Sequence, residues 1–117
     1  MSAVDRRRYA ILESLLRLQR TPAELQEALA AVSWDAEEEL VTLTRRDVRD
    51  VLQRALQGRI PLTDVEVWAE LIEGREDIGR ESGSEDELNE AIFELANPSL
   101  TDKTVETLIR RWTARLA

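Results

Sequence analysis

Three glutamates, Glu66, Glu70 and Glu73, are the residues best suited to binding a charged partner. Their spacing of four and three residues places the three carboxylates on one face of a predicted helix. A solvated helix face usually has Lys or Arg at such positions, and this segment has neither. Like charges at this spacing destabilise a helix by roughly a few tenths of a kcal/mol each. The pattern therefore favours a functional acidic surface, with an ordinary solvated face as the alternative.

The surrounding window, residues 64–94, contains all of the chain's excess negative charge. It has 12 acidic residues against two bases, Arg75 and Arg80, in a chain of net charge −8. A second predicted helix in the window repeats the glutamate spacing, with Glu87, Glu90 and Glu94. Complementary charge speeds the encounter of two proteins and disfavours wrong partners. We therefore expect this window to bind a basic protein partner.

Residues 74–84 contain glycine, serine and many charges, and we expect them to form the longest and most mobile loop. Two adjacent acids in it, Glu76 and Asp77, could help to hold Mg²⁺ or Ca²⁺. The alternating ligand spacing of a calcium site is missing, so we expect no metal ion. An Arg75 bridge to the protein's own acids, or a partner contact by Glu76 and Asp77, is the better interpretation. The predicted partner-binding set is Glu66, Glu70, Glu73, Glu76 and Asp77.

The chain has no cysteine and no histidine. Without cysteine, disulfides, thiolate zinc sites and cysteine catalysis are excluded. Without histidine, the commonest general base and the commonest metal ligand are missing. An enzyme would have to use carboxylates and oxygen-bound metal alone. We therefore expect no catalytic residues, no cofactor and no enzymatic activity.

Nucleic acid and membranes are not expected partners. The predicted helices over 45–57 and 64–73 could form a helix-turn-helix, but the second one contains acids and no base, and phosphates would repel it. No segment approaches the roughly 20 apolar residues needed to cross a bilayer. The first apolar stretch, residues 9–18, is interrupted by Glu13 and Arg17 and has no signal-peptide cleavage site. We therefore expect a soluble, cytoplasmic protein.

Helix-start signals dominate the sequence and predict an all-α fold. Four pairs match the capping-box pattern: Thr21 with Glu24, Thr44 with Asp47, Thr63 with Glu66, and Ser84 with Glu87. Apolar residues at helical spacing predict helices over residues 5–19, 22–32, 45–57, 64–73, 85–96 and 102–116. At 117 residues and 43% apolar composition, we expect a single domain, 1–117, folded as one compact bundle of five to six helices.

The aromatic residues predict where the bundle packs. Trp68 and Trp112 lie in apolar stripes and should be buried, and Tyr9 should point inward from the first helix. Trp34 is the tryptophan with the best claim to partial exposure, but packing against the bundle is the favoured interpretation. Residues 40–43 have a strand-like composition, but no second segment offers them a partner, and an isolated strand is unstable. Asp35 with Glu38 could instead cap a short helix, which we favour, with an extended conformation of residues 35–43 as the alternative.

One part of the chain resembles a known family. Its residues are the helix end Val51-Leu52-Gln53-Arg54-Ala55-Leu56, then Gly58, Ile60 and Thr63, and the acidic helix with Val67-Trp68-Ala69. Over residues 43–100 this pattern resembles small helical bacterial immunity proteins, in particular the colicin D immunity-like group. In that family acidic helix residues cover the basic active-site cleft of a ribonuclease toxin. The resemblance implies the same role for the acids of residues 64–73.

These observations leave three hypotheses. The first is an immunity or antitoxin-like protein whose acidic face blocks the basic active site of a nuclease toxin. The second is a helical adaptor or regulator, monomer or homodimer, that acts through self-association or another protein partner. The third is a carboxylate enzyme with a metal ion. Salt-sensitive binding to a basic protein would favour the first, concentration-dependent self-association the second, and tight divalent-metal uptake the third.

Overall fold

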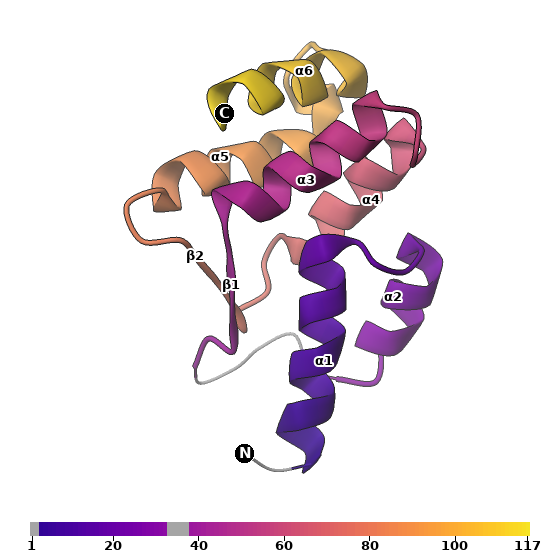
Figure 1. The fold of residues 1–117 in the computed structure, drawn as a ribbon, viewed down its shortest axis with the longest axis vertical. Helices are drawn as coiled ribbons and strands as arrows, with labels where there is room; N and C mark the ends of the chain where they lie inside the picture. The colour runs from indigo at the N-terminus through magenta and orange to yellow at the C-terminus, as the bar shows by residue number, and fades with distance from the viewer. Residues whose placement is uncertain (1–2, 33–37) are drawn as a thin grey trace.

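The computed structural model describes residues 3–32 and 38–117, and these form a helical bundle with a very small sheet (Figure 1). The helices are α1 (Ala3–Arg17), α2 (Pro22–Leu29), α3 (Arg45–Leu56), α4 (Leu62–Ile72), α5 (Glu85–Ala96) and α6 (Val105–Arg115), with a short 3₁₀ helix η1 (Pro98–Leu100). The strands are β1 (Val41–Leu43) and β2 (Ile78–Arg80). The predicted all-α bundle of five to six helices is confirmed. Within the described ranges, no helix is long and apolar enough to cross a membrane.

The helix α4 is the central element of the bundle. Its most extensive contacts are with α5, and it also contacts α1, α2, α3 and α6. In Figure 1, α1 and α2 form one end of the molecule and α3, α5 and α6 form the other, with α4 between them. The inner face of α4 is therefore held by the whole core, which gives its outer face a defined orientation.

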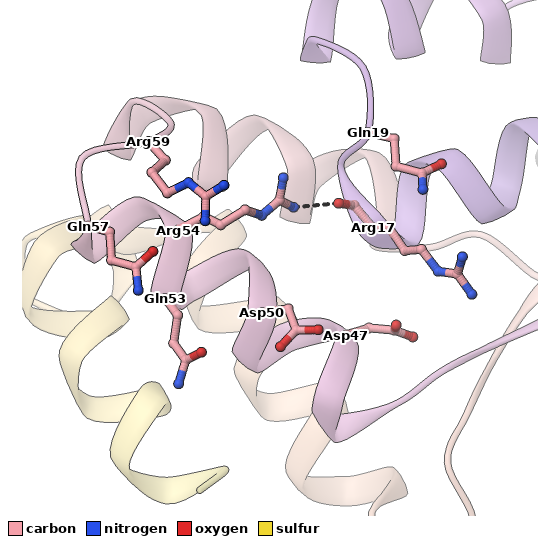
Figure 2. A pocket seen from close by; sticks show the side chains of 8 residues that line it. All are labelled: Arg17, Gln19, Asp47, Asp50, Gln53, Arg54, Gln57 and Arg59. Atoms are coloured by element: carbon pink, nitrogen blue, oxygen red, sulfur yellow. Dashed lines mark hydrogen bonds between the residues drawn. The ribbon is translucent and has the colours of Figure 1, made fainter.

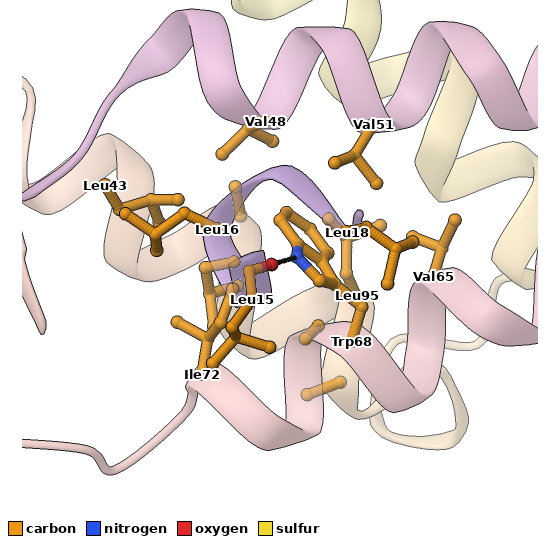
Figure 3. Close-up of a cluster of buried hydrophobic side chains, with 14 of the residues drawn as sticks. Leu15, Leu16, Leu18, Leu43, Val48, Val51, Val65, Trp68, Ile72 and Leu95 are labelled. Carbon is orange, nitrogen blue, oxygen red and sulfur yellow. Dashed lines mark hydrogen bonds between the residues drawn. The ribbon is translucent and has the colours of Figure 1, made fainter. Parts of the chain in front are cut away.

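Trp68 lies at the centre of the hydrophobic core (Figure 3). Its side chain is fully buried, and its indole Nε1–H donates a hydrogen bond of 2.8 Å to the main-chain carbonyl oxygen of Leu15 on α1. A buried indole needs such an acceptor, because an unsatisfied N–H would carry a desolvation penalty. Trp112 on α6 is also fully buried. Both tryptophan predictions are confirmed, and Trp34 lies outside the described residues.

Two of the four predicted capping boxes form. The Thr21 hydroxyl accepts from the Glu24 amide at 3.2 Å, and the Glu24 carboxylate accepts from the Thr21 amide at 3.1 Å. Thr44 and Asp47 make the same reciprocal pair at 3.0 and 3.1 Å. In both cases the neighbouring residues supply the whole motif, so local sequence is sufficient to predict it.

The other two capping boxes were wrong. The helix α4 begins at Leu62 after Pro61, so Thr63 already lies inside it and cannot cap it. Ser84 precedes α5 but makes no side-chain capping hydrogen bond. The Glu87 carboxylate that should complete the Ser84 box instead pairs with Arg45 of α3. A tertiary partner has replaced the local one.

Two predictions for the first helix were also wrong. Tyr9 is 41% exposed and does not point into the core. The helix ends at Arg17, because Leu18 adopts a left-handed conformation (φ 47°) and its amide bonds back into the last turn. Glycine usually occupies this position, so no sequence signal marked the end. Arg54 of α3 donates hydrogen bonds to the carbonyl oxygens of Arg17 and Leu18 and closes the exposed helix end.

The expectation for residues 40–43 was wrong, because these residues do have a strand partner. Strand β1 pairs in parallel with β2, with Val41 opposite Ile78 and Leu43 opposite Arg80. The partner comes from residues 74–84, which therefore do not form one continuous loop. A parallel pair needs a long crossover, here α3 and α4, so the two strands lie far apart in sequence. Most of the predicted helix starting at Asp35 lies outside the described residues.

Candidate partner-binding surface

The outer face of α4 presents the three glutamates singled out by their spacing. The helix buries its inner face, formed by Val65, Trp68, Ala69 and Ile72. Glu70 and Glu73 are exposed, and Glu66 is partly buried. We call Glu66, Glu70 and Glu73 the α4 acidic face. Glu76, a few residues further along the chain, is exposed as well.

Glu70 and Glu73 lie at the end of α4 that least favours acids. The helix ends at Ile72, Glu73 is its C-cap residue, and its last turn contains no base. The C-terminal end of a helix carries a partial negative charge, which attracts cations and repels carboxylates. These two acids therefore add to an existing negative potential. Helix stability does not account for their position.

The first-turn acids of α5 have a local explanation. Glu85, Asp86 and Glu87 all lie in the first turn, where the partial positive charge at the helix N-terminus stabilises carboxylates. The Glu85 carboxylate also accepts a hydrogen bond of 2.7 Å from the amide of Gly83. Acids at these positions stabilise α5 and need no external partner.

The remaining glutamates of α5 turn toward neighbouring helices. Glu94 accepts a hydrogen bond of 2.8 Å from the indole Nε1–H of Trp112 on α6. Glu90 lies 3.8 Å from the guanidinium of Arg115, also on α6. Together with the pairing of Glu87 and Arg45, these contacts give each glutamate of the α5 repeat a partner within the molecule. The repeated spacing on α5 is therefore structural.

Asp77 is an interior residue, and its interpretation as a partner contact needs correction. Its side chain is fully buried and accepts hydrogen bonds from Arg75 at 2.9 and 3.0 Å and from Arg8 of α1 at 2.9 Å. Burial alone would raise the pKa of Asp77, but the hydrogen bonds and charges of Arg75 and Arg8 outweigh it and hold the pKa below its ordinary value. The alternative interpretation, an internal bridge to Arg75, is confirmed.

Asn97 contributes to the α4 acidic face, and the sequence did not indicate this role. In the sequence, Asn97 followed by Pro98 indicates only the end of a helix. Its side-chain amide donates a hydrogen bond of 3.1 Å to the Glu73 carboxylate and one of 2.9 Å to the carbonyl oxygen of Phe93. Because this amide joins the ends of α4 and α5, it fixes the position of the Glu73 carboxylate on the surface.

A second polar region is the hollow of about 440 Å³ between α1 and α3 (Figure 2). Its lining residues are Arg17, Gln19, Asp47, Asp50, Gln53, Arg54, Gln57 and Arg59. Two of its charged groups already have structural tasks, because Asp47 caps α3 and Arg54 closes α1. Among the described residues, no three acidic side chains gather closely enough to hold a metal ion. We assign no chemistry to this hollow.

Comparison with known proteins does not assign the chain to a family. No protein-family model, no curated protein and no solved structure matches it. The resemblance of residues 43–100 to immunity proteins therefore depends on the sequence pattern alone. Function has to be argued from the geometry and charge of the surface itself.

Proposed function

We propose that the chain is a non-catalytic protein-binding module that binds a basic protein through the α4 acidic face and Glu76. One observation carries the proposal. Glu70 and Glu73 are exposed at the negative end of a helix whose last turn has no base, and the hydrogen bond that Glu73 accepts comes from the uncharged Asn97 amide, whereas Glu87, Glu90 and Asp77 pair with arginines. Two carboxylates placed against the helix dipole without a compensating positive charge are expected at a functional surface.

A cationic partner would relieve the repulsion that the fold leaves in place. Lys or Arg side chains beside Glu70 and Glu73 would offset both the like charges and the partial charge at the helix end. The same field would attract a basic protein from a distance and repel an acidic one. Because α4 contacts α1, α2, α3, α5 and α6, its backbone needs little rearrangement before binding.

The specific form of the proposal is an immunity or antitoxin-like protein that neutralises a nuclease toxin. A nuclease binds phosphates with Lys and Arg side chains in a cleft. Four carboxylates would bind those Lys and Arg side chains in place of phosphate: Glu66, Glu70, Glu73 and Glu76. The chain would therefore compete with the nucleic-acid substrate for the cleft. The resemblance of residues 43–100 to the colicin D immunity-like group supports this form.

Self-association as a helical adaptor is the second candidate, and the exposed apolar side chains favour it. Phe93 is 49% exposed and Leu100 is 69% exposed. A homodimer interface would cover such side chains. Sedimentation at increasing protein concentration separates the two candidates, because only the adaptor predicts a dimer in the absence of another protein.

Differential capture from the native host tests the first candidate. The bait proteins are the parent, Glu70→Lys/Glu73→Lys, and a control with the same change of net charge away from α4, Glu85→Lys/Asp86→Lys. We expect a basic protein to be captured by the parent and by the control but not by the α4 variant. When purified, that protein should cleave nucleic acid, and the parent should inhibit it competitively. Equal capture by all three baits would contradict the proposal.

A further inference from the structure

A surface hollow of about 370 Å³ adjoins the α4 acidic face, between α2 and α4. It is lined by Leu29, Glu70, Leu71, Glu73, Gly74 and Arg75. Leu71 of α4, which is partly exposed, and the small accessible part of Leu29 of α2 (5% exposed) give it a mainly apolar lining, and the two glutamates supply carboxylates beside it. An apolar wall next to two carboxylates suits a side chain that has an apolar stem and a cationic head.

The accessible charge in this hollow is negative. Glu70 and Glu73 are exposed, whereas the side chain of Arg75 is only 8% exposed and is hydrogen-bonded to the buried Asp77 carboxylate. The Asp77 carboxylate, which Arg75 shares with Arg8, offsets part of the positive charge of Arg75 and holds its side chain inside the molecule. An entering side chain therefore meets two carboxylates and the negative end of α4.

We propose that this hollow receives one arginine side chain of the basic partner. The inference rests on the proposed function and adds the chemistry of the contact. The three methylene groups of arginine would pack on Leu29 and Leu71, and the guanidinium would donate to the carboxylates of Glu70 and Glu73. Arginine fits better than lysine because its planar fork has several N–H donors and is less strongly hydrated than an ammonium group.

The Glu73 carboxylate and the helix that carries Glu70 are both oriented before binding. Asn97 donates a hydrogen bond of 3.1 Å to Glu73, which leaves acceptor capacity on that carboxylate for the partner. The core around Trp68 fixes the helix that presents Glu70 and Leu71. Preorganisation of this kind lowers the entropy lost on binding.

Short peptides test the selectivity of the hollow on the parent protein. The probes are acetyl-Gly-Arg-Gly-amide and its lysine and citrulline counterparts, titrated against protein with labelled leucine methyl groups and observed by NMR. The arginine peptide should shift the methyl signals of Leu29 and Leu71, with weaker shifts for lysine and none for the uncharged citrulline. Equal shifts with arginine and lysine, or no shift at these two leucines, would overturn the proposal.

Paired variants test the apolar part of the contact. Leu71→Ser keeps every charge but removes part of the apolar wall. It should weaken binding of the arginine peptide about fourfold, because roughly one methylene group less is buried in the complex. Leu100→Ser, an exposed leucine on η1, is the control and should bind as the parent does. Equal effects of the two variants would overturn the proposal. If Leu71→Ser does not fold, the peptide series on the parent decides.

The two proposals can fail separately. If Glu70→Lys/Glu73→Lys weakens binding of the captured protein but Leu71→Ser does not, the proposed arginine contact is wrong and the proposed acidic binding surface stands. If the double reversal leaves capture unchanged, the proposed function itself is wrong.

Discussion

The helices α4 and α5 pack against each other and carry similar runs of glutamates, yet the fold uses the two runs differently. The acids of α5 lie in its first turn or pair with Arg45, Arg115 and Trp112. Glu70 and Glu73 of α4 lie exposed at the C-terminal end of their helix, where carboxylates are unfavourable. One run contributes to stability and the other weakens its own helix.

This difference shows that a charge count and a charged surface are separate properties. The window 64–94 has 12 acids, but the side chain of Asp77 is buried between two arginines. The α5 glutamates Glu87, Glu90 and Glu94 contact arginines of α3 and α6 or the Trp112 indole of α6. The part of the window best suited to an external cation is the α4 acidic face with Glu76. The following predictions test this division, from the largest expected effect to the smallest.

The largest effect should come from the inner face of α4. Trp68→Ala should lower the free energy of unfolding by about 3–5 kcal/mol, because it leaves a cavity and deprives the Leu15 carbonyl of its donor. Chemical denaturation of the parent and the variant would measure the difference. A change below about 1 kcal/mol would mean that α4 is not fixed as described.

The next effect contrasts two adjacent acids, Asp77 and Glu76. Asp77→Ala should lower the free energy of unfolding by about 3 kcal/mol, because it leaves Arg8 and Arg75 without their shared carboxylate. Glu76→Ala, an exposed neighbour, should change it by less than about 0.5 kcal/mol. Equal effects in denaturation would contradict the assignment of Asp77 to the interior.

The Asp77 contribution should also depend on pH. The pKa of Asp77 is lowered in the folded protein from its ordinary value of 3.8. Its stabilisation is therefore present above that value and is lost as the pH falls through the lower folded pKa. The stability difference between the parent and Asp77→Asn should shrink over that acidic range. A difference that stays constant there would contradict the bridge.

The smallest stability effects should have opposite signs on the two helices. Glu85→Lys/Asp86→Lys should destabilise the protein by about 1 kcal/mol, because it places cations at the helix N-terminus. Glu70→Lys/Glu73→Lys should leave stability unchanged or raise it by a few tenths of a kcal/mol, because the relief of like charges at the C-terminal end of α4 offsets the loss of the exposed hydrogen bond between Asn97 and Glu73. Thermal unfolding of both variants measures this. Destabilisation of the same size in both variants would contradict the proposed difference between the acids of α4 and those of α5.

Local chemistry explains which features the sequence could predict. Thr21 with Glu24 and Thr44 with Asp47 contain their whole motif within four residues, and the stripes around Trp68 and Trp112 follow the helical period. The exposure of Glu70 and Glu73 followed from the same periodicity. These features need no knowledge of distant segments.

The features that the sequence could not give depend on contacts between distant segments. Asp77 is buried because Arg8, 69 residues away, supplies one of its donors. Strand β2 contains a single bulky apolar residue, Ile78, and becomes a strand only beside β1. Likewise, the hollow beside α4 exists only because Leu29 of α2 lies next to Leu71. In each case the residue types are visible in the sequence, but their neighbours are not.

The most direct test of the central claim is the rate of association with the captured basic protein at low and high salt. The account predicts that Glu70→Lys/Glu73→Lys slows association by about tenfold at low salt, and that the deficit shrinks as salt screens the charges. The matched variant Glu85→Lys/Asp86→Lys should associate almost as fast as the parent. If both variants slow association equally, or neither does, α4 has no special role and its acids are only a solvated surface.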